Sequence, residues 1–351
     1  MSSTWGEKIR ISIFGGSHTR AIGVNIEGLP AGEPICWEQV LGQMARRAPG
    51  QDPTATTRKE ADTPQVLCGL LDGVTTGAPL CAIIENTNQR SKDYSSLRVL
   101  PRPGHADYAG YIHSEGCGDY RGGGHFSGRL TAPLVFAGAV AKLILREMDV
   151  TVSARISNVA GIPDPTPEQL EEAVLGAKAD QDSVGGCIRC TVEGLPAGLG
   201  APDYGRNVEG IFSQHLFAVP AVKAVGFGAG FGFAAMRGSE ANDPFCWEGG
   251  EVRTRTNHSG GVNGGITNGM PVVFRTAVKP TPSIYKEQET VDYIAKQDTP
   301  LSIQGRHDPC IVPRAAIVQT CAAALAVGDL MTARYGTAWM ERPTSYRREG
   351  L

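Results

Sequence analysis

The segment LTAPLVFAGAVAKLIL, residues 130–145, is the most apolar stretch of the chain. Pro133 and Lys142 interrupt it. We therefore interpret it as a buried helix and not as a membrane span, which needs about 20 predominantly apolar residues in a row. A second alanine-rich apolar segment lies at 314–334. Two buried helices, at about 130–148 and 314–334, are predicted from these segments.

Short motifs around these helices occur twice in the same order. EGLPAG occurs at 27–32 and again at 193–198, and the pattern Gly-x-Thr-x-Gly-x-Pro before an apolar strand occurs at 73–84 and 265–276. Each half then runs through a loop that contains Arg and His, RGGGHFSGR or GRHDPCIVPR, into one of the apolar helices. Ordered repetition of this kind indicates two copies of one α+β unit that share a core.

The repeat predicts the domain organisation. We expect a single domain, 1–351, made of two related halves at about 9–150 and 186–335. The predicted fold class is α+β: an internally duplicated β-α-β sandwich with helices packed between antiparallel sheets. A surface helix is expected at 166–178, where Thr166 and Gln169 form a capping box. Strands are expected from β-branched and apolar content at 9–14, 22–27, 80–85, 187–193 and 271–278.

Composition restricts the class of protein. Apolar residues make up 41% and charged residues 20% of the chain, which is typical of a soluble globular protein. The net charge of −3 argues against a general nucleic-acid binder. The nine cysteines are scattered, so we expect reduced thiols in a cytoplasmic protein, and we interpret Cys187 and Cys190 as strand residues. The N-terminus lacks the long apolar run of a signal peptide.

The reactive residue types gather in loops rich in glycine and proline. DYRGGGHFSGR, residues 119–129, has three consecutive glycines, which suggests a backbone pressed against a ligand. Arginine binds phosphate and carboxylate through two parallel hydrogen bonds, so several such loops suit a small substrate with more than one anionic group. The loops are FGGSH (14–18), RRAPGQ (46–51), RPGHADY (102–108), DYRGGGHFSGR (119–129) and GRHDPC (305–310).

Two histidines in these loops are candidates for proton transfer. His18 follows Gly-Gly-Ser and His105 follows Arg-Pro-Gly, where a turn can present an imidazole. A metal-dependent phosphatase is an alternative, because His105 with Asp107 and His307 with Asp308 resemble fragments of metal sites. The neighbouring arginines would repel a dication, so we expect no metal. A flavin or anion binder without enzymatic activity is the third hypothesis.

The loops together resemble the chorismate synthase family. FGGSH is similar to that family's Phe-Gly-Glu-Ser-His segment. RRAPGQ, ENTNQRSKDY, RPGHADY, DYRGGGHFSGR, the Lys-Pro-Thr-Pro-Ser string at 279–283 and GRHDPCIVPR match in order and spacing. The resemblance runs from about residue 8 to 334. It implies a lyase of the shikimate pathway to the aromatic amino acids. The reaction is a 1,4-anti elimination of phosphate from 5-enolpyruvylshikimate 3-phosphate, which gives chorismate. It uses reduced FMN without net redox change.

The resemblance also implies roles for individual residues. Catalytic roles fall on His18, His105 and Asp308. Substrate anions are expected at Arg47, Arg102, Ser127, Arg129 and Arg306, with Arg46 and Arg121 as weaker candidates. The flavin is expected at His125, Phe126, Ser127, Pro220, Ala221, Gly264, Lys279, Pro280, Thr281, Pro282, Ser283 and Arg306.

The sequence departs from the family pattern at several positions. Gly16 stands for a frequent glutamate, Thr19 for a glycine and Ala48 for a third arginine. Pro53 stands where some members carry an arginine associated with nucleotide binding, which leaves Arg47 as a weak NADP contact. His125 and Phe126 replace a common Arg-Ser pair. We expect a homotetramer that depends on a separate flavin reductase, with NADPH as a second source of reductant, and no nucleic-acid or membrane partner.

Overall fold

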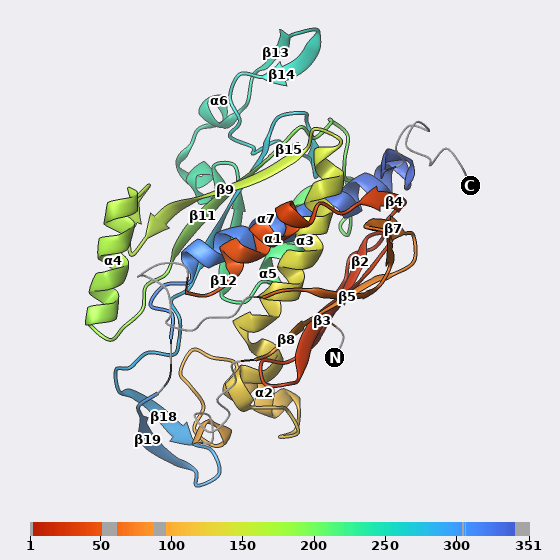
Figure 1. Ribbon diagram of the computed structural model, residues 1–351. Helices are drawn as coiled ribbons and strands as arrows, with labels where there is room; N and C mark the ends of the chain where they lie inside the picture. Colours follow the sequence, from red (N-terminus) through yellow and green to blue (C-terminus); the bar gives the residue numbers. More distant parts are fainter. Residues whose placement is uncertain (1–2, 51–61, 88–95, 304, 306, 341–351) are drawn as a thin grey trace.

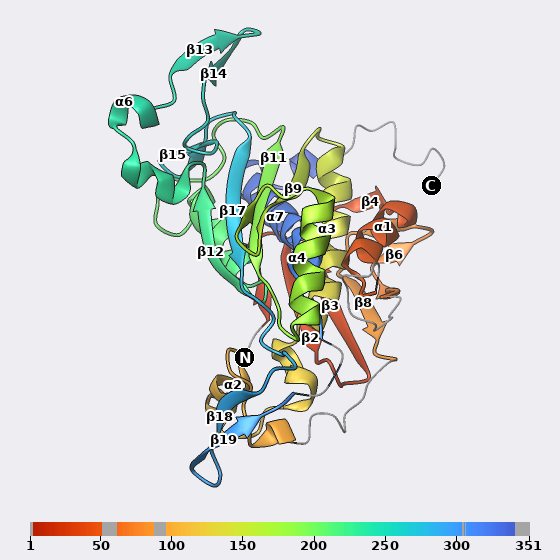
Figure 2. The ribbon, with the colours of Figure 1, turned by 90° about the vertical axis from the view of Figure 1, so that its left-hand side faces the viewer.

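Two long helices lie between two antiparallel sheets in the computed structural model (Figures 1 and 2), which describes residues 3–50, 62–87, 96–303, 305 and 307–340. The predicted buried helices are confirmed as α3 (Thr131–Arg146) and α7 (Val312–Tyr335). The two helices pack against each other, α3 also against the first sheet and α7 against the second. The other helices are α1 (Trp37–Arg47), α2 (Asp107–His113), α4 (Pro167–Ala179), α5 (Val208–Phe217) and α6 (Gly238–Ala241).

Each large sheet has five strands, and the five predicted strands are confirmed among them. The order of the first sheet is β1 (Thr4–Trp5), β2 (Arg10–Gly15), β3 (Ala21–Glu27), β8 (Leu80–Glu85) and β5 (Gln65–Cys68). The order of the second is β10 (Ile162–Pro163), β9 (Thr151–Val159), β11 (Gly186–Glu193), β17 (Val272–Val278) and β12 (Val222–Phe227). In β11, Ile188, Cys190 and Val192 alternate with less buried residues, so one face of the strand enters the core.

Smaller sheets extend from this core. β4 (Ala31–Pro34), β7 (Val74–Thr76) and β6 (Leu70–Leu71) form one of them. The others are hairpins: β13 (Phe245–Glu248) with β14 (Glu251–Thr254), β15 (Val262–Asn263) with β16 (Ile266–Thr267), and β18 (Gln288–Asp292) with β19 (Gln297–Leu301).

The long helices belong to the core of the protein. The segment 128–146 and α7 are long and apolar enough to cross a membrane, but 78% and 100% of their apolar windows are buried inside the protein. Gly138 of α3 lies directly against α7, because a Cβ there would be 2.3 Å from the Cβ of Cys321. The apolar surface that marks these helices in the sequence is therefore used in packing them against each other and against the sheets.

Matching contacts in the first and second parts of the chain support our proposal of two related halves. Each EGLPAG motif begins at the last residue of a central strand, β3 or β11. In the first half the Thr75 hydroxyl donates to the carbonyl of Pro30, and in the second Thr267 donates to Pro196 at 2.7 Å. β9 lies between the proposed halves, 9–150 and 186–335, and pairs with β11 of the second.

The segment between the repeats forms the predicted surface helix. α4 begins directly after Thr166, whose hydroxyl accepts from the backbone N–H of Gln169 at 3.3 Å. The Gln169 side chain accepts from the backbone N–H of Thr166 at 3.0 Å. The predicted capping box is confirmed.

Candidate active site

The three consecutive glycines lie against the two candidate histidines. Gly122, Gly123 and Gly124 have φ angles of 60°, 82° and 53°, a region that side chains disfavour. A Cβ on Gly122 would be 2.2 Å from the His18 ring, and one on Gly123 would be 3.0 Å from Cε1 of His105. Gly122 and Gly123 therefore make room for imidazoles, and a Cβ on Gly124 would lie 2.2 Å from the Asp119 carbonyl oxygen. The approach of this backbone to a ligand stays a prediction.

His18 is held at the end of β2 by its neighbour Ser17. The Ser17 hydroxyl lies 3.1 Å from Nδ1 of His18 and 3.1 Å from the carbonyl oxygens of Arg121 and Gly122. The Ser17 backbone N–H donates to the Gly124 carbonyl at 3.2 Å. These contacts join the FGGSH loop to the triple-glycine loop and leave His18 only 7% exposed.

His105 belongs to a compact charged group with Arg102 and Asp107. Nδ1 of His105 is 2.6 Å from Oδ1 of Asp107. The Arg102 guanidinium donates to both Asp107 oxygens, through Nε at 2.7 Å and Nη2 at 2.8 Å. Burial alone would raise the pKa of Asp107, but hydrogen bonds from Arg102 and His105 outweigh it and hold the pKa below its usual value. Asp107 therefore stays ionised beside the imidazole.

The loop at 279–283 meets this group from the second half of the chain. The Ser283 hydroxyl accepts from Nη1 of Arg102 at 3.2 Å. The Lys279 ammonium donates to the Gly104 carbonyl, and the Lys279 backbone N–H donates to the carbonyl of Ala221 at 3.0 Å. Burial and the nearby charge of Lys223 lower the pKa of Lys279.

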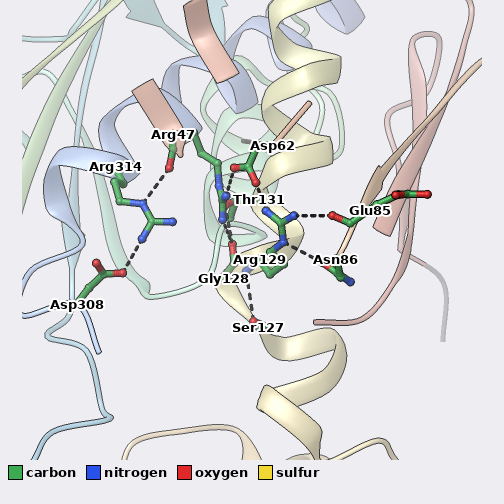
Figure 3. A network of polar contacts seen from close by, with 10 residues as sticks. All are labelled: Arg47, Asp62, Glu85, Asn86, Ser127, Gly128, Arg129, Thr131, Asp308 and Arg314. Carbon is green, nitrogen blue, oxygen red and sulfur yellow. Dashed lines mark hydrogen bonds and ion pairs between the residues drawn. The ribbon is translucent and has the colours of Figure 1, made fainter. Parts of the chain in front are cut away.

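A buried carboxylate joins two of the predicted anion-binding arginines (Figure 3). Asp62 forms ion pairs with both Arg47 and Arg129, and the three side chains are at most 4% exposed. Arg47 also donates to the Thr131 hydroxyl at 3.0 Å and to the Gly128 carbonyl at 3.1 Å. The two guanidiniums thus lie side by side because an anion of the chain separates their charges.

Asn86 and Arg314 extend this network to the candidate catalytic residues (Figure 3). Oδ1 of Asn86 accepts from Nε of Arg129 at 3.0 Å, and its amide nitrogen donates to the Gly16 carbonyl at 3.1 Å, next to the His18 loop. Arg314 donates to the Arg47 carbonyl at 2.9 Å and to Asp308 at 2.5 Å. Hydrogen bonds therefore connect Asp308, through Arg314 and the Asp62 network, to the Gly16 carbonyl in the loop that carries His18. The triple-glycine loop then lies between His18 and His105.

Most of the predicted site residues lie in this network or next to it. Ser127 accepts from the Arg129 backbone at 3.3 Å, and His125 contacts the Gly15 carbonyl at 2.9 Å through Nδ1. Phe126, which follows His125, is 45% exposed. Pro220, Pro280, Thr281 and Pro282 lie in the loops that join at Lys279.

Other predicted residues do not join the network. Gly264 lies in the β15–β16 turn, at the opposite end of the molecule from α2 (Figures 1 and 2). Arg46 is exposed on α1, and Arg121 forms an exposed ion pair with Asp119. Arg306 and Pro53 lie outside the described residues.

Four residues of the network were missed as site residues: Asp62, Asn86, Asp107 and Arg314. Three of them lie in motifs quoted above: Asp107 in RPGHADY, Asn86 in ENTNQRSKDY and Arg314 at the end of GRHDPCIVPR. Asp62 carried no such signal. Among the described residues, no group of three or more His, Cys, Asp or Glu side chains is arranged to hold a metal ion. Asp107 itself is engaged by Arg102.

Comparisons with known proteins agree with the resemblance seen in the loops. A family model described as chorismate synthase matches residues 9–332. Chorismate synthases from Chitinophaga pinensis and Thermococcus kodakarensis are 48% and 42% identical to this chain, over 94% and 95% of it and over 96% and 98% of their own lengths. A crystal structure of a chorismate synthase shares the fold, with a TM-score of 0.73 and 24% identity over 96% of each chain. The chain belongs to the chorismate synthase family.

Proposed function

We propose that this chain is a lyase that eliminates phosphate from 5-enolpyruvylshikimate 3-phosphate in the 1,4-anti sense to give chorismate. The observation that carries the proposal is the network that links His18, His105 and Asp308 to three buried arginines of the first half, Arg47, Arg102 and Arg129, and to the half-buried Arg314 of the second. Proton-transfer groups and fixed positive charges in a site shielded from water are what departure of a phosphate requires.

The residues around Lys279 fit a flavin with a terminal phosphate. Lys223 and Lys279 are close enough for their like charges to lower the pKa of Lys279, and a bound phosphate would relieve that repulsion. The buried Thr281 hydroxyl has no hydrogen-bond partner among the described residues and could donate to the same group. Lys279 to Ser283, with Pro220, Ala221, His125, Phe126, Ser127 and Arg306, would hold FMN, whereas Gly264, in the β15–β16 turn away from α2, does not join this set. Reduced FMN, when bound, supplies electron density to the substrate.

The chain's own residues would manage protons. We assign His18, fixed by Ser17 against the triple-glycine loop, as the acid that protonates the departing phosphate. His105 presents Nε2 for proton exchange with the cofactor, because its Nδ1 faces Asp107. Asp308 takes the proton that comes from the substrate ring, and Arg314 holds its carboxylate in place at 2.5 Å.

The buried arginines would bind the substrate's phosphate and carboxylates. Arg47, Arg102 and Arg129 each pair with a carboxylate of the chain, which fixes the plane of the guanidinium before substrate arrives. A guanidinium has five N–H donors, and in Arg47 the bonds to Thr131, Asp62 and Gly128 use three of them, so the remaining N–H groups would serve the substrate. We add Ser127 and Arg306 to this set.

The proposal includes partners outside the chain. We propose a homotetramer in the cytoplasm that depends on a separate flavin reductase, with NADPH as the alternative source of reductant. Ala48, buried at the end of α1, is one of the departures that weigh against tight NADPH binding at Arg47.

An anaerobic assay tests the function. The protein is mixed with chemically reduced FMN and 5-enolpyruvylshikimate 3-phosphate, while chorismate absorbance and free phosphate are followed together. Equal release of both, lost with oxidised FMN and in His18→Ala, is expected. Phosphate without chorismate would instead support a phosphatase, and flavin binding without either product would support a binding protein.

A further inference from the structure

We infer that Asp107 is a positioning residue that fixes the tautomer of His105 and the orientation of Arg102. The inference rests on the proposed function, in which His105 exchanges a proton and Arg102 binds substrate. The sequence pointed to Asp107 only as a fragment of a metal site with His105, in the phosphatase alternative. Asp107 is close to His105 in the sequence, and its side chain also contacts both His105 and Arg102.

The hydrogen bonds of Asp107 are fully used by these two residues. Oδ1 faces Nδ1 of His105 at 2.6 Å and Nη2 of Arg102 at 2.8 Å. Oδ2 accepts from Nε of Arg102 at 2.7 Å and from its backbone N–H at 3.0 Å. The Asp107 side chain is 9% exposed and the Arg102 side chain 6% exposed. Water therefore competes little for these contacts.

This geometry selects one form of the imidazole. An ionised carboxylate only accepts hydrogen bonds, and Arg102 and His105 hold the pKa of Asp107 low against the effect of burial. Nη2 of Arg102, which can only donate, lies 3.1 Å from Nδ1 and 3.2 Å from Nε2 of His105, so one ring nitrogen accepts from it. Because the carboxylate at 2.6 Å needs a donor on Nδ1, we infer that Nδ1 carries the hydrogen and that the neutral ring keeps its lone pair on Nε2. A Cβ on Gly123 would lie 3.2 Å from Nε2 of His105 and 3.4 Å from Nη2 of Arg102, so the glycine makes room for both side chains.

A purely structural carboxylate would not need this arrangement. Asp107 is also the first residue of α2, where a carboxylate stabilises a helix end modestly. That role is satisfied without contact to the imidazole and predicts no effect on its tautomer. The tautomer is therefore the readout that separates positioning from helix stabilisation.

Nitrogen-15 NMR of histidine-labelled protein tests the inference directly. The His105 signals are identified by their loss in His105→Ala. In the wild-type protein we expect the neutral ring to be protonated on Nδ1, and in Asp107→Asn, whose amide can also donate, we expect a mixture or the Nε2 form. Asp164→Asn is the matched control, because Asp164 pairs with Arg155 on the surface at 63% exposure. A wild-type ring protonated on Nε2, or a tautomer unchanged in Asp107→Asn, overturns the inference.

Kinetics provide a second test in the anaerobic assay. We expect Asp107→Asn to lower kcat by about 10²–10⁴-fold, as a misoriented histidine does in a Ser-His-Asp triad. In a His105→Ala background the same change should alter kcat by no more than about twofold, with any remaining effect on KM through Arg102. A full loss of kcat in that background would show that Asp107 does not act through His105. If the wild-type protein makes no chorismate but its tautomer follows Asp107, the proposed function fails and the positioning role stands.

Discussion

Replacing Asp62 with asparagine should destabilise the fold severely. The substitution conserves size but removes the carboxylate charge that Arg47 and Arg129 share. The side chain of Arg47 is 3% exposed, that of Asp62 0% and that of Arg129 4%. Burial already lowers the pKa of Arg47 to about 10, against the opposing effect of Asp62. Removing one partner of a buried ion pair costs about 3–5 kcal/mol, since an uncompensated charge remains. We expect a loss of that size in the free energy of unfolding.

The same carboxylate gives a pH dependence with a definite sign. Burial would raise the pKa of Asp62, but Arg47 and Arg129 outweigh it, and the pKa in the folded protein is below the usual 3.8. A lowered pKa contributes stability above pH 3.8, and this contribution is lost as the pH falls through the folded-state value. The wild-type protein should therefore lose stability in acid more steeply than Asp62→Asn, which has no carboxylate to protonate there.

Urea unfolding of both proteins, at neutral pH and in acid, measures this effect. Asp164→Asn is the control, because its ion pair with Arg155 is exposed and should contribute less than about 1 kcal/mol. The reasoning would be refuted if Asp62→Asn lost less than about 1 kcal/mol of unfolding free energy at neutral pH, which is the contribution expected of an exposed ion pair. So would an identical acid dependence of the two proteins.

Three further substitutions test other parts of the structure. Gly122→Ala should abolish chorismate formation in the anaerobic assay, since its Cβ would be 2.2 Å from the His18 ring. Gly73→Ala is the control: its Cβ would have no atom within 4 Å, and its positive φ should cost only about 1 kcal/mol of stability. Asp329→Ala should cost at least about 1–3 kcal/mol and speed hydrogen exchange at residues 7–9, whose amides donate to that carboxylate at 2.5–3.1 Å. Thr166→Ala should cost about 1 kcal/mol in thermal unfolding without changing activity, because it removes only a helix cap.

Local features of the fold could be predicted well from the sequence. The apolar run at 130–145 and the capping box at Thr166 report forces that act within one element, namely burial of a helix and satisfaction of its first N–H groups. The repeated motifs predicted two related halves, and the structure supports this proposal with an equivalent hydrogen bond from Thr75 and from Thr267. The repeated motifs do not mark β9, which lies between the proposed halves and pairs with both β10 and β11.

The sequence by itself determined which residue types supply the proposed chemistry, namely the histidines, arginines and glycines of the loops quoted above. Only the tertiary structure decided how their charges are balanced. Asp62 follows Arg47 by 15 positions and precedes Arg129 by 67, and no local pattern links it to either. Asp62 pairs with Arg47 and Arg129 because two buried positive charges must be separated by an anion. That requirement exists only after α1, α3 and the loop at Asp62 have packed together.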